Sequence, residues 1–83
     1  MDFSDAFAFV LQRRRLAKGL SRSQLAELAG LHQTYVGLIE RGERNPSLDI
    51  SSVLADALGI PFSKLIAEAE EHRKSSGTKK VQR

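Results

Sequence analysis

The sequence predicts an all-α, compact five-helix domain, and two observations lead to that prediction. Apolar residues recur at intervals of three and four along most of the chain, which is the helical period. Most of the segments with this pattern begin at a serine or proline and are followed by a glycine, as is typical of helix starts and ends. One domain is expected over residues 1–72. Its size is near the lower limit for a self-sufficient core, so oligomerisation is a plausible source of extra stability.

The first helix is expected from residue 4 or 5 to Lys18, with Ser4 as its N-cap and Gly19 as its stop. Three arginines at positions 13–15 fill its last turns, where cations complement the negative end of the helix dipole. The apolar stripe of this helix is formed by Phe3, Phe7, Val10 and Leu11.

A second helix begins at Arg22, because Ser21 and Gln24 have the spacing of a capping box. Gly30 ends it, in a position where a left-handed backbone costs glycine little. Its apolar face is expected to consist of Leu25, Leu28 and Ala29, with the small Ala26 allowing another helix to approach.

Only Leu31 and His32 separate this stop from a third helix, expected over residues 33–41 with Val36 and Ile39 facing inward. A link that short forces the two helices to cross at a steep angle, as in a helix-turn-helix motif. His32 is expected at the N-cap, where a capping or phosphate-contacting role is favoured over a metal-ligand role because His72 lies in another helix.

These residues resemble the phage-repressor-like helix-turn-helix family of transcriptional regulators, the Xre type. The resemblance rests on Gln24-Leu25-Ala26, the turn glycine Gly30, and Ile39-Glu40-Arg41-Gly42. Residues 31–36 together with 39–47 are similar to the small controller proteins that time the expression of restriction-modification genes. The resemblance spans roughly residues 7–70. It implies an ion pair between Arg15 and Glu40, and a loop after the third helix that lies along the DNA backbone.

The third helix is interpreted as the recognition helix of such a motif. Its N-terminal residues Gln33 and Thr34 are expected to read bases, since glutamine can bond adenine bidentately and threonine can bond a base or touch a thymine methyl. Gly37 and Leu38 are expected on the same exposed face, with Gly37 permitting close backbone approach and Leu38 contacting a thymine methyl. Tyr35 either contacts DNA or packs on the rim of the core.

Phosphate contacts are expected from the start of the second helix and from the loop after the third. The free N–H groups and dipole of a helix start attract an anion, and Gly42 and Pro46 mark a turn in that loop. The predicted phosphate-binding residues are Arg22, Ser23, His32, Arg41, Arg44 and Asn45.

Ser47 is expected to cap a fourth helix over residues 48–58, with Leu48, Val53 or Leu54, Ala57 and Leu58 as its core face and Gly59 as its stop. Pro61 opens a fifth helix to about residue 72. In the family that this chain resembles, the last helix often forms a two-fold interface. The dimer candidates are Ile60, Phe62, Leu65 and Ile66, although covering the monomer core is the alternative role, above all for Leu65.

Positive charge is concentrated in two parts of the chain. Residues 13–44 carry seven bases and three acids, and residues 73–83 carry five bases and no acid. This distribution is the electrostatic footprint of a polyanionic partner. Residues 73–83 are predicted to form a disordered basic tail, which either adds non-specific DNA affinity or is solvated without a role.

The sequence excludes several other classes. There is no cysteine, the two histidines are far apart, and no glycine-rich phosphate loop is present, so we expect no enzyme, no metal and no cofactor. No apolar run approaches the roughly 20 residues that span a bilayer, and acids stand near the N-terminus where a signal peptide is basic. A soluble, cytoplasmic protein is expected.

The function predicted from these features is sequence-specific transcriptional regulation through a double-stranded DNA operator, bound as a homodimer. RNA polymerase would be excluded from the promoter or contacted there. The alternatives are an antitoxin-type autoregulator, for which the short tail leaves little room for a toxin-binding surface, and a protein-interaction module on the same fold.

Overall fold

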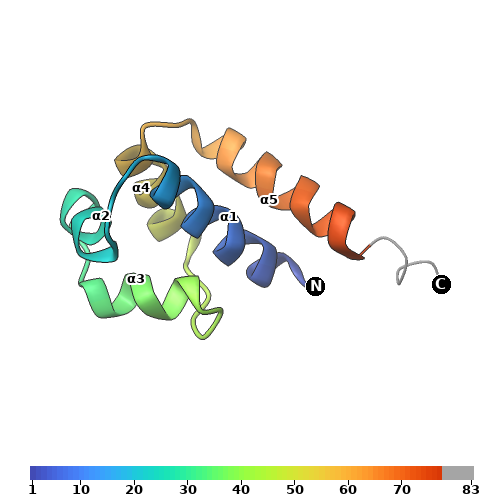
Figure 1. The fold of residues 1–83 in the computed structure, drawn as a ribbon, viewed down its shortest axis with the longest axis horizontal. Coiled ribbons are helices and arrows are strands. Elements are labelled where there is room, and N and C mark those ends of the chain that lie inside the picture. The colour runs from blue at the N-terminus through green and yellow to red at the C-terminus, as the bar shows by residue number, and fades with distance from the viewer. Residues whose placement is uncertain (78–83) are drawn as a thin grey trace.

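The computed structural model describes residues 1–77, which form five α-helices and no strand (Figure 1). The predicted all-α class is therefore confirmed for this part of the chain. In chain order the helices are α1 (Phe3–Ala17), α2 (Arg22–Ala29), α3 (Gln33–Glu40), α4 (Leu48–Leu58) and α5 (Phe62–Gly77).

Helix α1 is the centre of the arrangement. Figure 1 shows α5 running along α1 in the opposite direction, whereas α2 and α3 lie at the other side of α1. Helix α3 packs against both α1 and α2, and α4 packs against α2 and α5. Each helix contributes one apolar face to a single core, whose larger buried side chains are Phe7, Val10, Leu11, Leu25, Val36, Ile39, Leu54, Leu58 and Leu65.

Local sequence signals explain most helix boundaries. The Ser21 hydroxyl accepts from the Gln24 amide at 3.0 Å, and the Gln24 side chain accepts from the Ser21 amide at 2.8 Å, which completes the predicted capping box. Ser47 caps α4 in the same way, through the Ile50 amide at 3.1 Å. Gly30 ends α2 with a φ of 71°, a left-handed conformation that side chains disfavour.

The predicted start of α1 was wrong by one or two residues. Asp2, not Ser4, is the N-cap, and its carboxylate accepts from the Asp5 amide at 2.9 Å. A carboxylate makes a charge-assisted bond at the positive end of the helix dipole, so the Asp2 side chain satisfies the Asp5 amide, which has no partner within the helix. At the other end of α1, Lys18 is the C-cap rather than the last helical residue.

Two leucines that were assigned to core faces lie at the surface. Leu28 is 60% exposed and Leu48 is 76% exposed. Leu28 falls on the outer side of α2, whose buried edge is Leu25 and Ala26. Leu48 is the first residue of α4 and projects past the core, which is covered instead by the helical series Ser51, Leu54, Ala55 and Leu58.

Helix α5 continues to Gly77, five residues beyond its predicted end at His72. The His72 ring stacks on the Phe9 ring of α1 with centroids 4.1 Å apart and planes within 3°. The Arg73 guanidinium lies 5.8 Å from the centre of the Phe3 ring. These contacts hold the last turns of α5 against α1, so residues 73–77 are not part of a disordered tail. The remainder of the predicted tail, residues 78–83, lies outside the described residues.

Among residues 1–77, no single helix is long and apolar enough to cross a bilayer. The one pair that meets the length and composition requirements together, Leu48–Leu58 with Phe62–Ser75, is bent by 103°.

Candidate nucleic-acid interface

The connection between α2 and α3 is a tight turn that brings the two helices together. The Leu31 amide donates to the Ala26 carbonyl at 2.8 Å, which closes the end of α2. Ala26 is only 2% exposed, as expected for a small residue beneath a crossing helix. The predicted helix-turn-helix arrangement is therefore present.

His32 caps α3, as predicted. Its Nδ1 accepts a hydrogen bond from the Thr34 amide at 3.1 Å. This bond satisfies one of the free amides at the start of the helix, where Gln33 and Thr34 follow with exposed side chains. Both predicted base-reading residues are thus accessible on a helix start that is held in place.

A buried carboxylate joins α1, α2 and α3. Glu40 Oε2 accepts from Arg15 Nε at 2.8 Å, and Glu40 Oε1 accepts from Arg15 Nη2 at 3.0 Å, so the ion pair expected from the family resemblance is present and bidentate. The Glu40 side chain is fully buried and that of Arg15 is 7% exposed. Hydrogen bonding to Glu40 raises the pKa of Arg15, which keeps the guanidinium charged.

Arg22 shares this carboxylate. Its Nε lies 3.0 Å from Glu40 Oε1, while its side chain remains 41% exposed. Glu40 therefore holds the recognition helix to α1 and also orients an arginine of α2 toward the surface. The sequence did not indicate this second partner.

A surface groove lies between the start of α2 and α3. Its lining consists mostly of arginine and uncharged polar side chains. The residues are Arg15, Ser21, Arg22, Ser23, Gln33, Thr34, Gly37 and Arg41. A neighbouring groove is lined in part by Ser23, His32 and Gln33. Hydrogen-bonding side chains and guanidinium groups thus share one face of the helix pair, which is the chemistry needed to contact base edges and phosphates together.

Gly37 was predicted to lie on the exposed face of α3, and that prediction is wrong. Gly37 is buried, and the Arg41 side chain folds back over it. Arg41 Nε also lies 3.4 Å from Glu43 Oε2 in an exposed ion pair.

The other predicted contact residues differ in accessibility. Tyr35 is half-buried against the core, and the Arg44 guanidinium lies 5.5 Å from the centre of its ring. Tyr35 thus packs on the rim of the core and keeps part of its side chain accessible. Leu38 is half-buried, whereas Arg44 and Asn45 are exposed in the loop after α3.

Three of the four predicted dimer residues retain accessible surface. Ile60, Phe62 and Ile66 are half-buried and pack on the edge of the core. Leu65 is 0% exposed, so its assignment to an interface was wrong. It belongs to the core and is covered by the monomer itself, the alternative role that the sequence offered.

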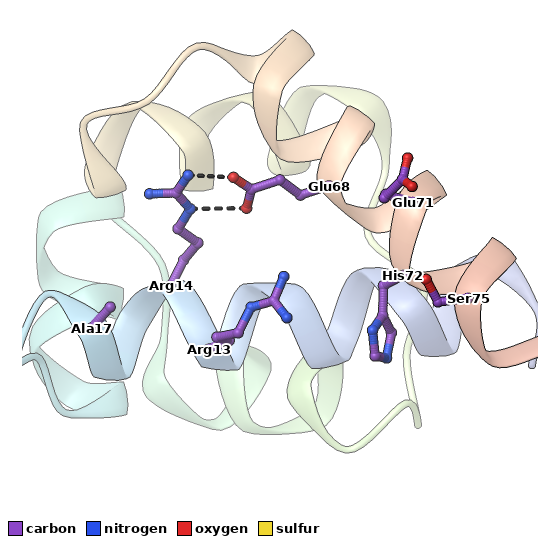
Figure 2. A pocket seen from close by; sticks show the side chains of 7 residues that line it. All are labelled: Arg13, Arg14, Ala17, Glu68, Glu71, His72 and Ser75. Carbon is purple, nitrogen blue, oxygen red and sulfur yellow. Dashed lines mark hydrogen bonds and ion pairs between the residues drawn. The ribbon is translucent and has the colours of Figure 1, made fainter.

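Another arginine–glutamate pair lies outside this interface, between α1 and α5. Arg14 Nε donates to Glu68 Oε1 at 2.9 Å, and Arg14 Nη2 pairs with Glu68 Oε2 (Figure 2). Hydrogen bonding to Arg14 lowers the pKa of Glu68. The two residues are 54 positions apart, and no sequence signal connected them.

Within residues 1–77, no group of three or more His, Asp or Glu side chains is placed to hold a metal ion. Figure 2 shows that the surface depression between α1 and α5 is lined by Arg13, the Arg14–Glu68 pair, Glu71 and His72. His72 is directed toward α1, where its ring is engaged with Phe9.

Comparison with known proteins agrees with this geometry. Residues 11–65 match the helix-turn-helix family model. Control protein C.SmaI of Serratia marcescens is 42% identical over 66 residues, which cover 80% of this chain and 79% of C.SmaI. The crystal structure of the restriction-modification controller protein C.AhdI from Aeromonas hydrophila has a TM-score of 0.73 and 47% identity, over 75% of this chain and 94% of that one.

A more distant structure shares the fold. C.Esp1396I, solved bound to a 19 base pair DNA duplex, has a TM-score of 0.80 with 24% identity, over 87% of this chain and 96% of that one. The family match, the identity to C.SmaI and the arrangement of α2 and α3 lead to one conclusion. The chain belongs to the helix-turn-helix family of transcriptional regulators, together with the controller proteins it is similar to.

Proposed function

We propose that this chain is a sequence-specific DNA-binding regulator that binds a near-palindromic operator as a homodimer. The observation that carries the proposal is the groove between α2 and α3, where Gln33 and Thr34 share one face with the guanidinium groups of Arg22 and Arg41. Base-edge partners and phosphate partners are thereby presented together. A protein of the same fold, C.Esp1396I, has been solved bound to a DNA duplex, which supports DNA binding by this fold.

In this proposal α3 enters the major groove with its N-terminal end first. Gln33 bonds an adenine through N6 and N7, and Thr34 offers a hydroxyl to a base or its methyl to a thymine. Leu38 adds an apolar contact from the next turn of the helix. Tyr35 contributes through the edge that the core and Arg44 leave accessible.

Backbone phosphates fix the register of this docking. Arg22 is held by Glu40 through Nε, so its terminal nitrogens are oriented before DNA arrives and less conformational entropy is lost on binding. The remaining phosphate contacts come from both sides of the recognition helix: Ser23, His32, Arg41, Arg44 and Asn45. Such contacts make affinity fall as salt rises, without adding sequence preference.

A second copy of the chain is proposed to dock on Ile60, Phe62 and Ile66, which are half-buried at the edge of the core in the α4–α5 link and the first turns of α5. Two recognition helices related by a two-fold axis read half-sites about 34 Å apart. Binding to the operator then represses transcription by blocking RNA polymerase, or activates transcription by contacting it. In vitro transcription from an operator-bearing promoter separates these two outcomes.

The experiment that tests the proposal is selection of bound sequences from a random DNA pool at near-physiological salt. The same selection is made with Gln33→Ala and with Gln12→Ala on α1 as the matched control. A symmetric consensus, loosened at one position per half-site by Gln33→Ala alone, is expected. Salt-sensitive binding without any consensus would instead support a protein-interaction module. Sedimentation across concentrations tests the homodimer, which a monomer at all concentrations contradicts.

A further inference from the structure

We propose that Gly37 is a positioning residue for Arg41. Because Gly37 has no side chain, the Arg41 guanidinium lies down across α3 and, with Arg22, forms a two-arginine clamp for one DNA phosphate. The inference rests on the proposed DNA-binding function and identifies what shapes that site.

The backbone of α3 gives no reason for a glycine at this position. Gly37 lies in the middle of an eight-residue helix, and it is not among the glycines with positive φ. Glycine in a helix interior lowers helix stability relative to alanine. The position therefore carries a stability cost that the conformation of the chain does not require.

The space above Gly37 supplies the reason. A Cβ atom built on Gly37 would lie 3.1 Å from Arg41 Nη1 and 3.8 Å from Arg41 Cζ. The contact at 3.1 Å is closer than an ordinary van der Waals separation, so a methyl group requires the guanidinium to move by a few tenths of an ångström, and a longer side chain competes with it for the same space. Gly37 is buried, and the side chain that lies directly over it is that of Arg41.

This arrangement changes where the Arg41 charge lies. Arg41 is the C-cap of α3, yet its guanidinium folds back one helical turn and lines the same groove as Gln33 and Arg22. If the Arg41 side chain instead extended away from the end of α3, its guanidinium would lie outside that groove.

Each arginine of the clamp has a carboxylate beside Nε, a buried one for Arg22 and an exposed one for Arg41. Arg22 Nε is held by Glu40 at 3.0 Å, and Arg41 Nε lies 3.4 Å from Glu43. In both cases the carboxylate engages Nε, so the terminal nitrogens are available to an anion. Guanidinium groups bind phosphate oxygens through these nitrogens in short, charge-assisted bonds.

The test compares four proteins on the selected operator duplex: wild type, Gly37→Ala, Arg41→Ala and the double variant. Affinity is measured across salt concentrations, and stability by urea unfolding. Gly37→Ala is expected to raise stability yet weaken binding by about two- to threefold, with a slightly shallower salt dependence. Arg41→Ala is expected to weaken binding roughly tenfold or more, and Gly37→Ala is expected to add no further loss in that background.

Two results would overturn the proposal. An equal loss from Gly37→Ala with and without Arg41 would mean that the glycine admits the DNA backbone directly. No loss in either background would mean that Gly37 does not position Arg41. Arg73→Ala, which removes an exposed arginine from α5, is the control for a general charge effect.

A further measurement separates this inference from the proposed function. Side-chain ¹⁵N NMR of the free protein reports the Arg41 Nε–H signal without DNA, and Gly37→Ala is expected to shift it while leaving the Arg44 signal unchanged. An unchanged Arg41 signal contradicts the positioning role. A wild-type protein that binds no specific duplex, but shows the shift, contradicts the DNA-binding proposal and leaves the positioning role standing.

Discussion

Two adjacent arginines of α1 make similar ion pairs in opposite surroundings. Arg15 reaches Glu40 of α3, where the side chains are 7% and 0% exposed. Arg14 reaches Glu68 of α5, where they are 30% and 25% exposed. Both pairs are bidentate and join distant parts of the chain.

The difference in burial gives the two pairs different consequences. Two charges in the core have lost their water, so each depends on its partner. Without Arg15, the Glu40 carboxylate keeps only the bond from the partly exposed Arg22 to Oε1, and Oε2 is left buried without a partner. Charges near the surface are solvated and screened whether or not they are paired, and their contribution is small. The buried pair is therefore expected to hold the recognition helix in place, whereas the exposed pair adjusts how α5 lies on α1.

The largest effect is expected from Arg15→Ala. It removes both bonds to Glu40 and the bond from Arg15 Nη1 to the Leu20 carbonyl at 2.8 Å. The expected loss is about 3–5 kcal/mol of the free energy of unfolding, measured by urea denaturation followed by helical circular dichroism.

The double variant Arg15→Met/Glu40→Met is the control for this loss. Apolar side chains of similar size leave no unpaired charge in the core, so the double variant is expected to recover most of the stability. If it is as unstable as Arg15→Ala, the loss comes from packing rather than from an unpaired carboxylate.

A smaller loss of stability is expected from Arg22→Ala, because Arg15 still compensates Glu40. The loss should be no more than about 1 kcal/mol for this partly exposed side chain. DNA affinity should nevertheless decrease for all sequences alike, with the salt slope reduced by about one. A loss confined to particular base pairs would assign Arg22 to base reading instead.

The smallest effect is expected from Glu68→Gln, at about 0.5 kcal/mol near neutral pH. Because Arg14 lowers the pKa of Glu68 in the folded state, the pair stabilises the protein above the ordinary glutamate pKa of 4.5 and loses this effect as the pH falls further. The stability of wild type and Glu68→Gln should therefore converge in acid, as urea midpoints between pH 7 and pH 3 will test. Glu71→Gln removes the same charge from the same helix and is the control. The difference in urea midpoint between Glu71→Gln and wild type should not disappear in acid in this way.

The family resemblance anticipated one of these pairs and not the other. It implied the Arg15–Glu40 pair, because Glu40 stands in the Ile-Glu-Arg-Gly motif of the family. Arg14 has no such motif partner, so its bond to Glu68 follows only from α5 lying along α1. The exposure of Leu28 and Leu48 has a similar explanation. Helical periodicity indicates which face of a helix is most apolar, but it does not show which part of that face a neighbouring helix covers.

The sequence by itself determined the number of helices and the positions at which most of them begin and end. Ser21, Gly30, Ser47 and Gly59 act through hydrogen bonds and backbone conformations that span only a few residues, so local chemistry suffices. Tertiary structure alone decided the length of α5 and the partner of Arg14. These depend on contacts between side chains whose approach is set by how the helices pack, which no local pattern encodes.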